Sequence, residues 1–420
     1  MIWLYRTLWV VFGPLIDIAF CIRLYKGKEK WNKLPERLGF PKTGRPCGDI
    51  LWIHGASVGE MKSLFPLVSA LCEKLPEATV LLTSGTVTSA ELVAKQLPTW
   101  NGQVIHQMAP LDFGLSVHAF LKHWQPKMSV FVESEFWPEY LKQAPNPMLI
   151  NARVTARSYK KFKKFNFFFG PLLARLTGAL SQTDEISERL RNLGVHNVET
   201  APNIKVDAPL EEPDAEQLAK FKKMINGRPV LCFASTHQPE DDIIAMIHRG
   251  LREDIPDLIS IVVPRHPERG EHIAEFFTPL GIITRRRSLA EGIDKQTDIF
   301  VADSLGEMPL WYSLADAVIV GGSVFPHGGQ NPLEPLKMGK VVLCGEYMFN
   351  FDSLLTPLKP YKTPECYADL TELKKRALHV LTDKTLKTKL EKNNIKAAAS
   401  LSGGTETAML AILKAWENAS

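Results

Sequence analysis

The chain has 420 residues, which is too long for one ordinary hydrophobic core and predicts two domains. Apolar residues make up 45% of the chain and charged residues 23%, and this balance excludes extended disorder. The net charge of +4 gives no indication of a nucleic-acid partner. The six cysteines lack C-x-x-C spacing and the eleven histidines lack an H-E-x-x-H pattern, so we expect reduced cysteines and no metal site.

The N-terminal segment, residues 1–22, is strongly apolar but contains Arg6 and Asp17. A spanning helix needs about 20 mostly apolar residues, so this segment spans a membrane only if its charges pair or lie at the interface. The bulky residues at 20–22 argue against signal-peptide cleavage. We therefore expect residues 1–33 to be a retained membrane anchor whose basic flank keeps the rest of the chain cytoplasmic. A docked amphipathic helix is the alternative.

Between residues 50 and 200, short apolar runs alternate with helical patterns, which predicts a parallel sheet covered on both faces. Residues 202–228 are rich in proline and charge and are typical of an interdomain connection. The alternation then restarts and ends in a helical tail. We expect an α/β protein with two Rossmann-like domains, residues 34–205 and 206–420, whose strand ends face a common cleft.

Glu60 lies in the segment WIHGASVGE, after a predicted strand and at the start of a predicted helix. Catalytic side chains of open α/β sheets collect at such strand ends. Glu60 is then a candidate general base for an attacking hydroxyl, especially if burial raises its pKa. The spacing from Ser57 to Glu60 equally matches a capping box, in which the carboxylate only holds a backbone N–H.

Two further carboxylates, Glu133 and Glu135, end another apolar run in FVESEFWPEYL. They are candidate site residues at the same sheet edge, and a solvated strand end is the alternative. Lys205 lies between two apolar residues in NIKVD. We expect its ammonium to point into the cleft, unless it is an ordinary surface lysine.

A glycine-rich segment, GGSVFPHGGQNPLEP at residues 321–335, follows a strand-like run and precedes a helix-like run. Its glycine pairs allow positive φ and close approach to a ligand, and a helix start would point N–H groups at a phosphate. Asn331 is a candidate N-cap, and Glu334 is placed to accept hydrogen bonds from a ribose diol. The alternative is a glycine-rich turn with Glu334 exposed.

Basic residues end another strand in PRHPER, where Arg265, His266 and Arg269 lie close together. Guanidinium groups bind phosphate oxygens in bidentate fashion, so this strand end suits a phosphate leaving group. The turn at Gly306, Glu307 and Met308 is placed to present backbone groups to a nucleobase, although taken alone it is a weak signal.

Residues 157–176, RSYKKFKKFNFFFGPLLARL, combine lysine and arginine with phenylalanines at helical spacing. Each lysine near an anionic membrane surface contributes about 1 kcal/mol, and an aromatic face enters the headgroup region. The segment therefore indicates a membrane surface and a lipid-bound substrate. Burial of the phenylalanines in the domain core is the alternative.

In these motifs the chain resembles the 3-deoxy-D-manno-octulosonic acid (Kdo) transferases of lipopolysaccharide assembly, over nearly its whole length. The matching motifs include SVGE, ESEFWP, NARVTARS, NIKVD, ASTHQPED, PRHPER, LGEM and GGQNPLEP. The resemblance implies a GT-B fold and metal-independent, inverting transfer of Kdo from CMP-Kdo to a lipid A precursor at the cytoplasmic side of the inner membrane. It implies no cofactor beyond this donor substrate.

The resemblance also assigns residue roles. It implies that Glu60 is the proton acceptor and that Glu133 and Lys205 stabilise the transition state. The implied CMP site consists of Pro264, Arg265, His266, Gly306, Glu307, Met308, Asn331, Pro332, Leu333 and Glu334. Many relatives have GGHNPLEP where this chain has GGQNPLEP, so a family histidine is replaced by Gln330.

Two other interpretations stay open at this point. One is a different GT-B glycosyltransferase or a sugar-nucleotide epimerase, neither of which requires a lipid acceptor. The other is a non-catalytic membrane protein that binds nucleotide sugars.

Overall fold

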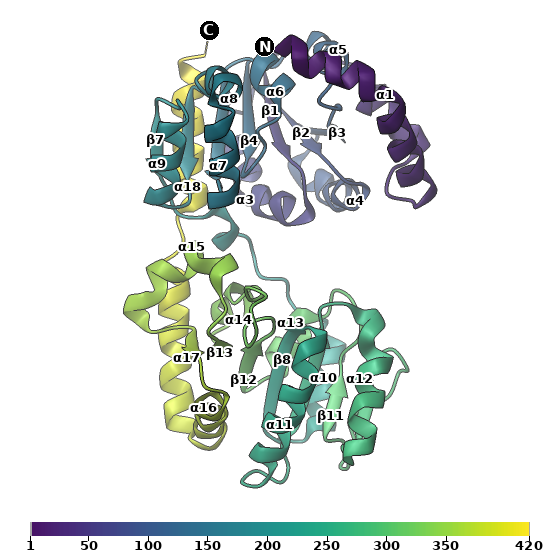
Figure 1. The fold of residues 1–420 in the computed structure, drawn as a ribbon, viewed down its shortest axis with the longest axis vertical. Coiled ribbons are helices and arrows are strands. Elements are labelled where there is room, and N and C mark those ends of the chain that lie inside the picture. The colour runs from purple at the N-terminus through teal and green to yellow at the C-terminus, as the bar shows by residue number, and fades with distance from the viewer. Residues whose placement is uncertain (1, 420) are drawn as a thin grey trace. The chain divides into compact units, whose positions relative to one another are not determined.

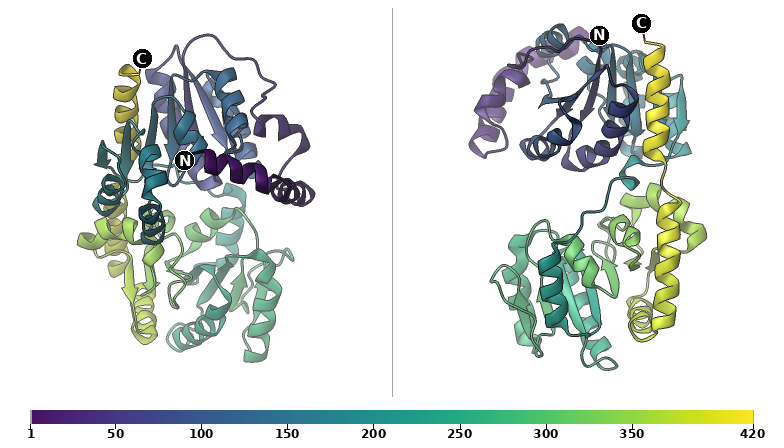
Figure 2. Two further views of the ribbon diagram at one scale, coloured as in Figure 1. Left: turned by 45° about the horizontal axis from the view of Figure 1, so that its top comes forward. Right: turned by 180° about the vertical axis from the view of Figure 1, so that it is seen from behind.

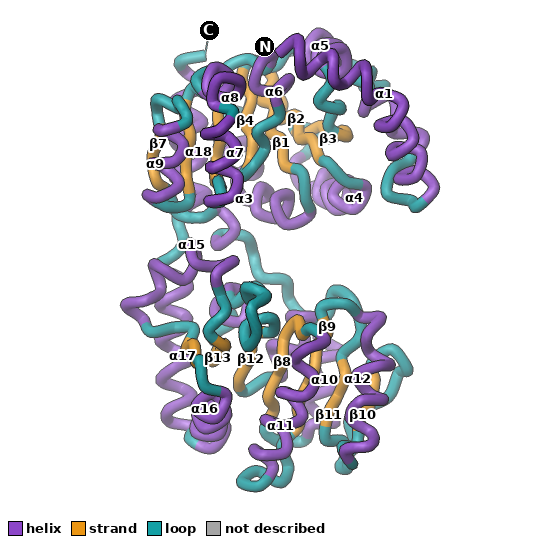
Figure 3. The backbone as a smooth tube through the Cα atoms, viewed as in Figure 1, coloured by secondary structure: helices purple, strands orange, loops and turns teal. Residues whose placement is uncertain are grey.

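The computed structural model describes residues 2–419, except for the side chains of residues 4, 8, 10, 14–17 and 19. The chain divides into two compact units: unit 1 comprises Met1–Ala208 and Ser402–Ser420, and unit 2 comprises Pro209–Leu401. Within the described residues, each unit contains one seven-stranded sheet, and all paired strands are parallel (Figures 1 and 3). The predicted pair of Rossmann-like α/β domains is confirmed.

In unit 1 the strand order is β3-β2-β1-β4-β5-β6-β7, which brings the carboxyl ends of β1, β4 and β5 together. The strands are β1 (Ile50–Gly55), β2 (Thr79–Ser84), β3 (Val104–Met108), β4 (Met128–Val132), β5 (Pro147–Ala152), β6 (Gly178–Ser181) and β7 (Val198–Thr200). The helices are α1 (Ile2–Tyr25), α2 (Leu34–Arg37), α3 (Val58–Lys74), α4 (Val87–Gln96), α5 (Gly114–Trp124), α6 (Pro138–Gln143), α7 (Ala156–Lys164), α8 (Asn166–Leu173), α9 (Asp184–Asn192) and α18 (Gly404–Glu417).

In unit 2 the order is β10-β11-β9-β8-β12-β13-β14, so the ends of β9, β8 and β12 are neighbours. The strands are β8 (Val230–Thr236), β9 (Ile259–Pro264), β10 (Thr284–Arg286), β11 (Ile299–Val301), β12 (Ala317–Val320), β13 (Val341–Gly345) and β14 (Glu365–Tyr367). The helices are α10 (Ala215–Ile225), α11 (Asp241–Arg252), α12 (Gly270–Phe277), α13 (Met308–Leu314), α14 (Leu333–Lys337), α15 (Asp352–Leu355), α16 (Leu370–Thr382) and α17 (Lys384–Ala399).

The strand β1 shows why these apolar runs form buried strands. Its side chains alternate between two cores, because helices cover both faces of the sheet (Figure 1). Leu51 and Ile53 belong to the core that includes residues of α3 and α18, whereas Ile50 and Trp52 pack in the core that includes residues of α5 and α6. All four side chains are fully buried.

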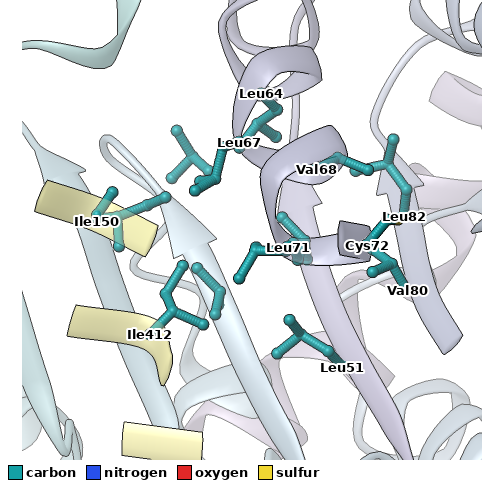
Figure 4. Close-up of a cluster of buried hydrophobic side chains, with 14 of the residues drawn as sticks. Leu51, Leu64, Leu67, Val68, Leu71, Cys72, Val80, Leu82, Ile150 and Ile412 are labelled. Atoms are coloured by element: carbon teal, nitrogen blue, oxygen red, sulfur yellow. The ribbon is translucent and has the colours of Figure 1, made fainter. Parts of the chain in front are cut away.

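The C-terminal helix α18 belongs to unit 1, although the sequence placed residues 402–420 in the second domain. Ile412 of α18 is buried in the same core as Leu67 and Leu71 of α3 (Figure 4). The carboxylate of Asp207 accepts hydrogen bonds from the backbone N–H groups of Gly403 and Thr405 at 3.0 and 2.6 Å. These contacts correct the predicted domain boundary, which lies after residue 208 and again after residue 401.

The predicted connection 202–228 also contributes to both units. Its residues up to 208 belong to unit 1, and residues 215–225 form α10 of unit 2. Phe221 and Ile225 of α10 are buried in the core beneath β8 and β9. The predicted connection between the units thus lies within this segment, and the segment also contains a helix whose apolar residues recur at helical spacing.

The N-terminal helix α1 is docked on unit 1, as Figures 1 and 2 show for the purple end of the chain. The hydroxyl of Tyr5 donates to Oδ2 of Asp112 at 2.6 Å, and the guanidinium of Arg6 donates to both carboxylate oxygens of Glu139 at 2.6 and 2.9 Å. Trp9 contacts Phe113 with ring centroids 5.7 Å apart. Burial raises the pKa of Asp112 to about 6, and the Tyr5 hydrogen bond opposes that rise.

Several apolar side chains of α1 are exposed to solvent. Its exposed apolar side chains are Trp3, Val11, Phe12, Ile18 and Ile22. No helix within the described residues is long and apolar enough to cross a membrane. The docking contacts match the amphipathic-helix alternative for this segment.

Candidate active site

Glu60 lies in the first turn of α3, directly after β1, and only 9% of its surface is exposed. Its carboxylate accepts hydrogen bonds from the backbone N–H of Ala56 at 2.6 Å and from the hydroxyl of Ser57 at 2.9 Å. Ser57 is the N-cap, and its Oγ accepts from the Glu60 N–H at 3.3 Å. This reciprocal pairing is a relative of the capping box, and it fixes the carboxyl group at the sheet edge.

The electrostatic surroundings of Glu60 suit a proton acceptor. Burial raises the pKa of its carboxyl, and the charges of Glu133 and Glu135 raise it further, against the lowering effect of the Ala56 and Ser57 hydrogen bonds. A carboxylate with a raised pKa takes a proton from a hydroxyl more readily than an exposed carboxylate does. The capping and catalytic interpretations of this residue are therefore compatible.

Glu133 directly follows β4 and adopts a φ of 60°, a left-handed conformation that is uncommon for a residue with a side chain. Its buried carboxylate is ion-paired with Lys205 and accepts a hydrogen bond from the Asn151 amide at 3.4 Å. Backbone strain of this kind is concentrated at functional sites. Lys205, in the 3-10 helix Ile204–Val206, is therefore a partner of Glu133 rather than an ordinary surface lysine.

Glu135 has a different role from its neighbour. Its Oε2 lies 3.2 Å from Nε2 of His54 and also accepts from the Trp137 indole N–H. Burial alone would raise the pKa of Glu135, but the hydrogen bonds and charge of His54, together with Trp137, lower it. Glu135 is thus held ionised at the same edge where the pKa of Glu60 is raised.

Sequence reasoning missed two residues of this cluster, His54 and Asn151. Asn151 adopts a φ of 51°, and its side-chain Oδ1 is buried without a hydrogen-bond partner among the described residues. His54 lies at a strand end in WIHGAS, and Asn151 lies at a strand end in NARVTARS. The sequence signal that could have identified them is the position of these strand ends next to those of Glu60 and Glu133 in the sheet order. The cluster offers the buried carboxyl of Glu60, two further carboxyl groups and one cation.

In unit 2, Pro264 ends β9, and Arg265 and His266 follow it with exposed side chains. His266 lies 3.8 Å from the exposed Glu268. Arg269, the third residue of the predicted phosphate-binding group, is instead ion-paired with the buried Asp241 at 2.5 Å. Arg265 and His266 remain the accessible basic groups of this strand end.

The turn at Gly306 has a φ of 80° and leads into α13, which starts at Met308. The carboxylate of Glu307 accepts from the Arg287 guanidinium at 2.7 and 3.0 Å and also from the Ser304 hydroxyl. The hydrogen bond from Arg287 lowers the pKa of Glu307, and burial partly opposes it. The Glu307 side chain is therefore engaged within unit 2, and its carbonyl accepts from the N–H groups of Leu310 and Trp311 at 3.0 and 3.3 Å.

The glycine-rich segment 321–335 is a tight loop. Gly322, Gly328 and Gly329 have φ values of 65°, 104° and 77°. A Cβ atom on Gly321 would lie 2.4 Å from the carbonyl oxygen of Ser235, so only glycine fits there. The positive φ values are as the sequence predicted, and the close approach at Gly321 is to the backbone of Ser235.

The helix start after this loop differs from the prediction. Pro332, not Asn331, is the N-cap of α14, which has only five residues, so no anion site is assigned to this helix terminus. Asn331 instead accepts from the Leu333 N–H at 3.0 Å and donates to Oε1 of Glu334 at 3.4 Å. Pro332 and Leu333 are buried, whereas Asn331 and Glu334 are exposed.

A further residue of this region, His237, was not identified from the sequence. It directly follows β8, and its Nε2 lies 2.9 Å from Nε2 of Gln330. His237 is the histidine of the motif ASTHQPED, which contributed to the family resemblance but did not mark this residue as part of the site. Among residues 2–419, no group of three or more His, Cys, Asp or Glu side chains is arranged to hold a metal ion.

The basic aromatic segment forms two helices, α7 and α8, which meet at Phe165. Phe162 and Phe169 pack against the core of unit 1, so for them the core alternative is correct. Phe165 and Phe167 are 47% and 61% exposed and lie beside exposed lysines of α7. The segment therefore carries both a buried and an exposed aromatic group.

Comparison with known proteins decides the family. The family model described as 3-deoxy-D-manno-octulosonic-acid transferase (kdotransferase) matches residues 32–208. The 3-deoxy-D-manno-octulosonic acid transferase of Haemophilus influenzae is 32% identical over 363 residues, which cover 84% of each chain. This chain belongs to the Kdo transferase family. The resemblance drawn from the sequence and the assignment as a Kdo transferase are confirmed.

Two solved structures share the fold of this family member. A glycosyltransferase from Rickettsia africae matches with a TM-score of 0.57 and 12% identity, covering 89% of this chain and 99% of that chain. A UDP-GlcNAc 2-epimerase from Neisseria meningitidis matches with a TM-score of 0.58 and 11% identity, covering 87% of this chain and 100% of that chain. With two parallel sheets, the fold is GT-B-like, and at these identities the likeness concerns the fold alone.

Proposed function

We propose that this Kdo transferase moves Kdo from CMP-Kdo to a lipid A precursor such as lipid IVA, with inversion at the anomeric carbon and Glu60 as the general base. The observation that carries the proposal is the buried carboxyl of Glu60, whose pKa is raised and whose position is fixed by Ala56 and Ser57. A base of this kind contributes about 10² to 10⁴ in rate.

The reaction is a direct displacement. Glu60 accepts the proton of the acceptor hydroxyl, and the hydroxyl oxygen forms a bond to the anomeric carbon of Kdo. The bond between that carbon and the phosphate oxygen breaks, and CMP leaves with the electron pair. Glu133 and Lys205, which are already paired, supply a fixed arrangement of charge for the transition state.

The residues of unit 2 hold the donor in this proposal. Arg265 and His266 bind the phosphate, because both are exposed and basic at the end of β9. Gly306, Glu307 and Met308 present backbone groups to the cytosine. Asn331, Pro332, Leu333 and Glu334 form the ribose end, where the Glu334 carboxylate accepts from the diol. This assignment follows the family motif residue by residue.

The acceptor is a lipid, so unit 1 must work at a membrane surface. The exposed apolar side chains of α1 and the exposed Phe165 and Phe167 provide apolar groups for the headgroup region. Contact between Tyr5 and Phe168, at 6.3 Å between ring centroids, joins α1 to α8. We place this surface on the cytoplasmic side of the inner membrane, with α1 lying in the interface.

Purified protein incubated with CMP-Kdo and lipid IVA tests the proposal. Mass spectrometry should detect lipid IVA that carries one or more Kdo residues. Turnover of a UDP-sugar without a lipid acceptor would favour the epimerase alternative instead. Binding of CMP-Kdo without any product would favour the non-catalytic alternative.

A further inference from the structure

Histidine side chains from three adjacent strands of unit 2 meet at one place. His237 follows β8, His266 follows β9 and His327 lies in the loop after β12, and these strands are neighbours in the order β9-β8-β12. The ring centroid of His237 is 4.0 Å from that of His327 and 6.4 Å from that of His266. His237 therefore occupies the centre of the strand ends that the donor site uses.

The contact with Gln330 indicates the tautomer of His237. The amide nitrogen of Gln330 can only donate a hydrogen bond, so Nε2 of His237 is the acceptor at 2.9 Å. In the neutral ring the proton then resides on Nδ1. The backbone at this position is also fixed, because the N–H of His237 donates to Glu240 at 2.8 Å.

The surroundings of His237 favour an anion. Burial and the neighbouring basic groups together lower the pKa of His237 to about 4. Those basic groups are His327, His266, Arg269 and Arg265. The nearby acids are already engaged or point to solvent. Glu240 accepts from the N–H groups of His237 and Gly322, Asp241 pairs with Arg269, and Glu268 is largely exposed beside His266.

The protonation state of Glu240 also leaves this site short of negative charge. The pKa of Glu240 is raised to about 7, because burial outweighs the lowering effect of the hydrogen bonds from Gly322 and His237. Near neutral pH, Glu240 is thus partly protonated and offsets less of the surrounding positive charge. A bound anion at the His237 ring would supply the missing negative charge.

We propose that His237, oriented by Gln330, is a specificity-determining residue that donates its Nδ1–H to the carboxylate of the donor sugar. The inference rests on the proposed CMP-Kdo donor. In Kdo the anomeric carbon carries both the carboxylate and the phosphate ester, so the two anionic groups lie side by side. Arg265 and His266 on the neighbouring strand take the phosphate, which leaves the central histidine for the carboxylate.

Calorimetric titration of the full chain with CMP and with CMP-Kdo separates the two anions, because CMP has the phosphate but no sugar carboxylate. His237→Gln retains a side-chain acceptor for Gln330 but has no donor at the Nδ1 position. His237→Asn retains a donor at that position. His379→Gln, at an exposed position of α16, is the control for replacing a histidine in unit 2.

We expect His237→Gln to weaken CMP-Kdo binding about tenfold or more, since a hydrogen bond to a charged group is lost. CMP binding should change by less than about twofold, which is within ordinary variation between surface variants. His237→Asn should recover part of the CMP-Kdo affinity, and His379→Gln should match the wild type. Equal weakening for CMP and CMP-Kdo, or no weakening for either, would overturn the inference.

The titration also separates this inference from the proposed function. If the wild type fails to bind CMP-Kdo, the proposed donor is wrong. If the wild type binds CMP-Kdo and His237→Gln binds it equally well, the donor stands and only the role of His237 is wrong.

The tautomer is tested by long-range proton–nitrogen spectra of histidine-labelled protein, with His237→Gln used for assignment. We expect a protonated Nδ1 and an unprotonated Nε2 for His237. Gln330→Ala should give a mixture of tautomers and weaken CMP-Kdo more than CMP. A wild-type ring protonated on Nε2 would contradict the proposed geometry.

Discussion

Lys205 and Glu133 form an ion pair that joins the 3-10 helix Ile204–Val206 to the carboxyl end of β4. The Glu133 carboxylate is buried, and its charge raises the pKa of Glu60. The pair therefore does two things in the proposed mechanism. It holds charge in place for the transition state, and it sets how strongly Glu133 acts on the base.

Lys205→Met should move the acid limb of the pH–rate profile to higher pH. Glu60 must be ionised to act as a base, so the rate falls as the pH drops through its raised pKa. Without the Lys205 cation, the negative charge of Glu133 acts on Glu60 with less compensation and raises that pKa further. Measurement of kcat/KM from pH 5 to 9 checks the shift. If kcat/KM decreases while the midpoint of the acid limb stays unchanged, Lys205 does not influence the pKa of Glu60.

Variants of Asn151 distinguish the effect of its side chain on Glu133 from the effect of its left-handed backbone conformation. Asn151→Gly and Asn151→Ala both remove the hydrogen bond to Glu133, but only glycine adopts the φ of 51° without strain. We expect both variants to lose activity to a similar extent, up to about 10²-fold. Asn151→Ala should also be less stable than Asn151→Gly by about 1 kcal/mol in urea unfolding. If glycine restores full activity, the Asn151 side chain does not position Glu133.

Arg6→Ala should destabilise unit 1 by loosening α1. Glu139 is fully buried and would lose its bidentate partner, whereas Arg6 itself is about one-third exposed. Loss of one partner of a buried pair costs about 3 to 5 kcal/mol, and the exposure of Arg6 reduces this to about 2 kcal/mol. Arg6→Lys keeps the charge but not the fork, so its loss should be smaller. Urea unfolding followed by circular dichroism measures both, and an unchanged midpoint for Arg6→Ala would rule out a docking role.

The proposed membrane surface predicts a clear contrast in vesicle flotation. The double variant Phe165→Ser and Phe167→Ser should bind vesicles that contain anionic lipid more weakly than the wild type, because both side chains are exposed. Met246→Ser, at an exposed position of α11 in unit 2, is the matched control and should bind normally. Added salt should weaken the binding of all three proteins through the lysines of α7. Equal flotation of the double variant and the wild type would place the membrane contact elsewhere.

The sequence predicted the strand ends well because their signals are local. Glu133 and Arg265 directly follow β4 and β9, and Glu60 lies in the first turn of the helix that follows β1. The sequence analysis did not identify β6, β7, β10 and β14, which have three or four residues each and too few apolar positions to show a pattern.

The features that sequence analysis missed depend on contacts between distant residues. The packing of Ile412 against α3 assigns α18 to unit 1, and nothing within residues 402–420 indicates this. Arg269 matched a phosphate-binding pattern, but the buried Asp241 engages it. His237 and Gln330 come together only because β8 and β12 are neighbours in the sheet.

Glu60→Gln should remove the base and slightly stabilise the protein. A carboxyl with a raised pKa in the folded state binds its proton more tightly there than in the unfolded chain, so its ionisation costs stability as the pH rises through that pKa. The variant lacks this cost. We expect its melting temperature at pH 8 to equal or exceed that of the wild type, and a large decrease would mean that the Ala56 and Ser57 hydrogen bonds require a carboxylate.

The most direct test of the central claim is the transfer rate of Glu60→Gln with CMP-Kdo and lipid IVA, measured by mass spectrometry of the lipid product beside calorimetric binding of CMP-Kdo. The account predicts that transfer falls by about 10² to 10⁴ while CMP-Kdo binding is retained. Transfer close to the wild-type rate in this variant would contradict the role of Glu60 as the general base.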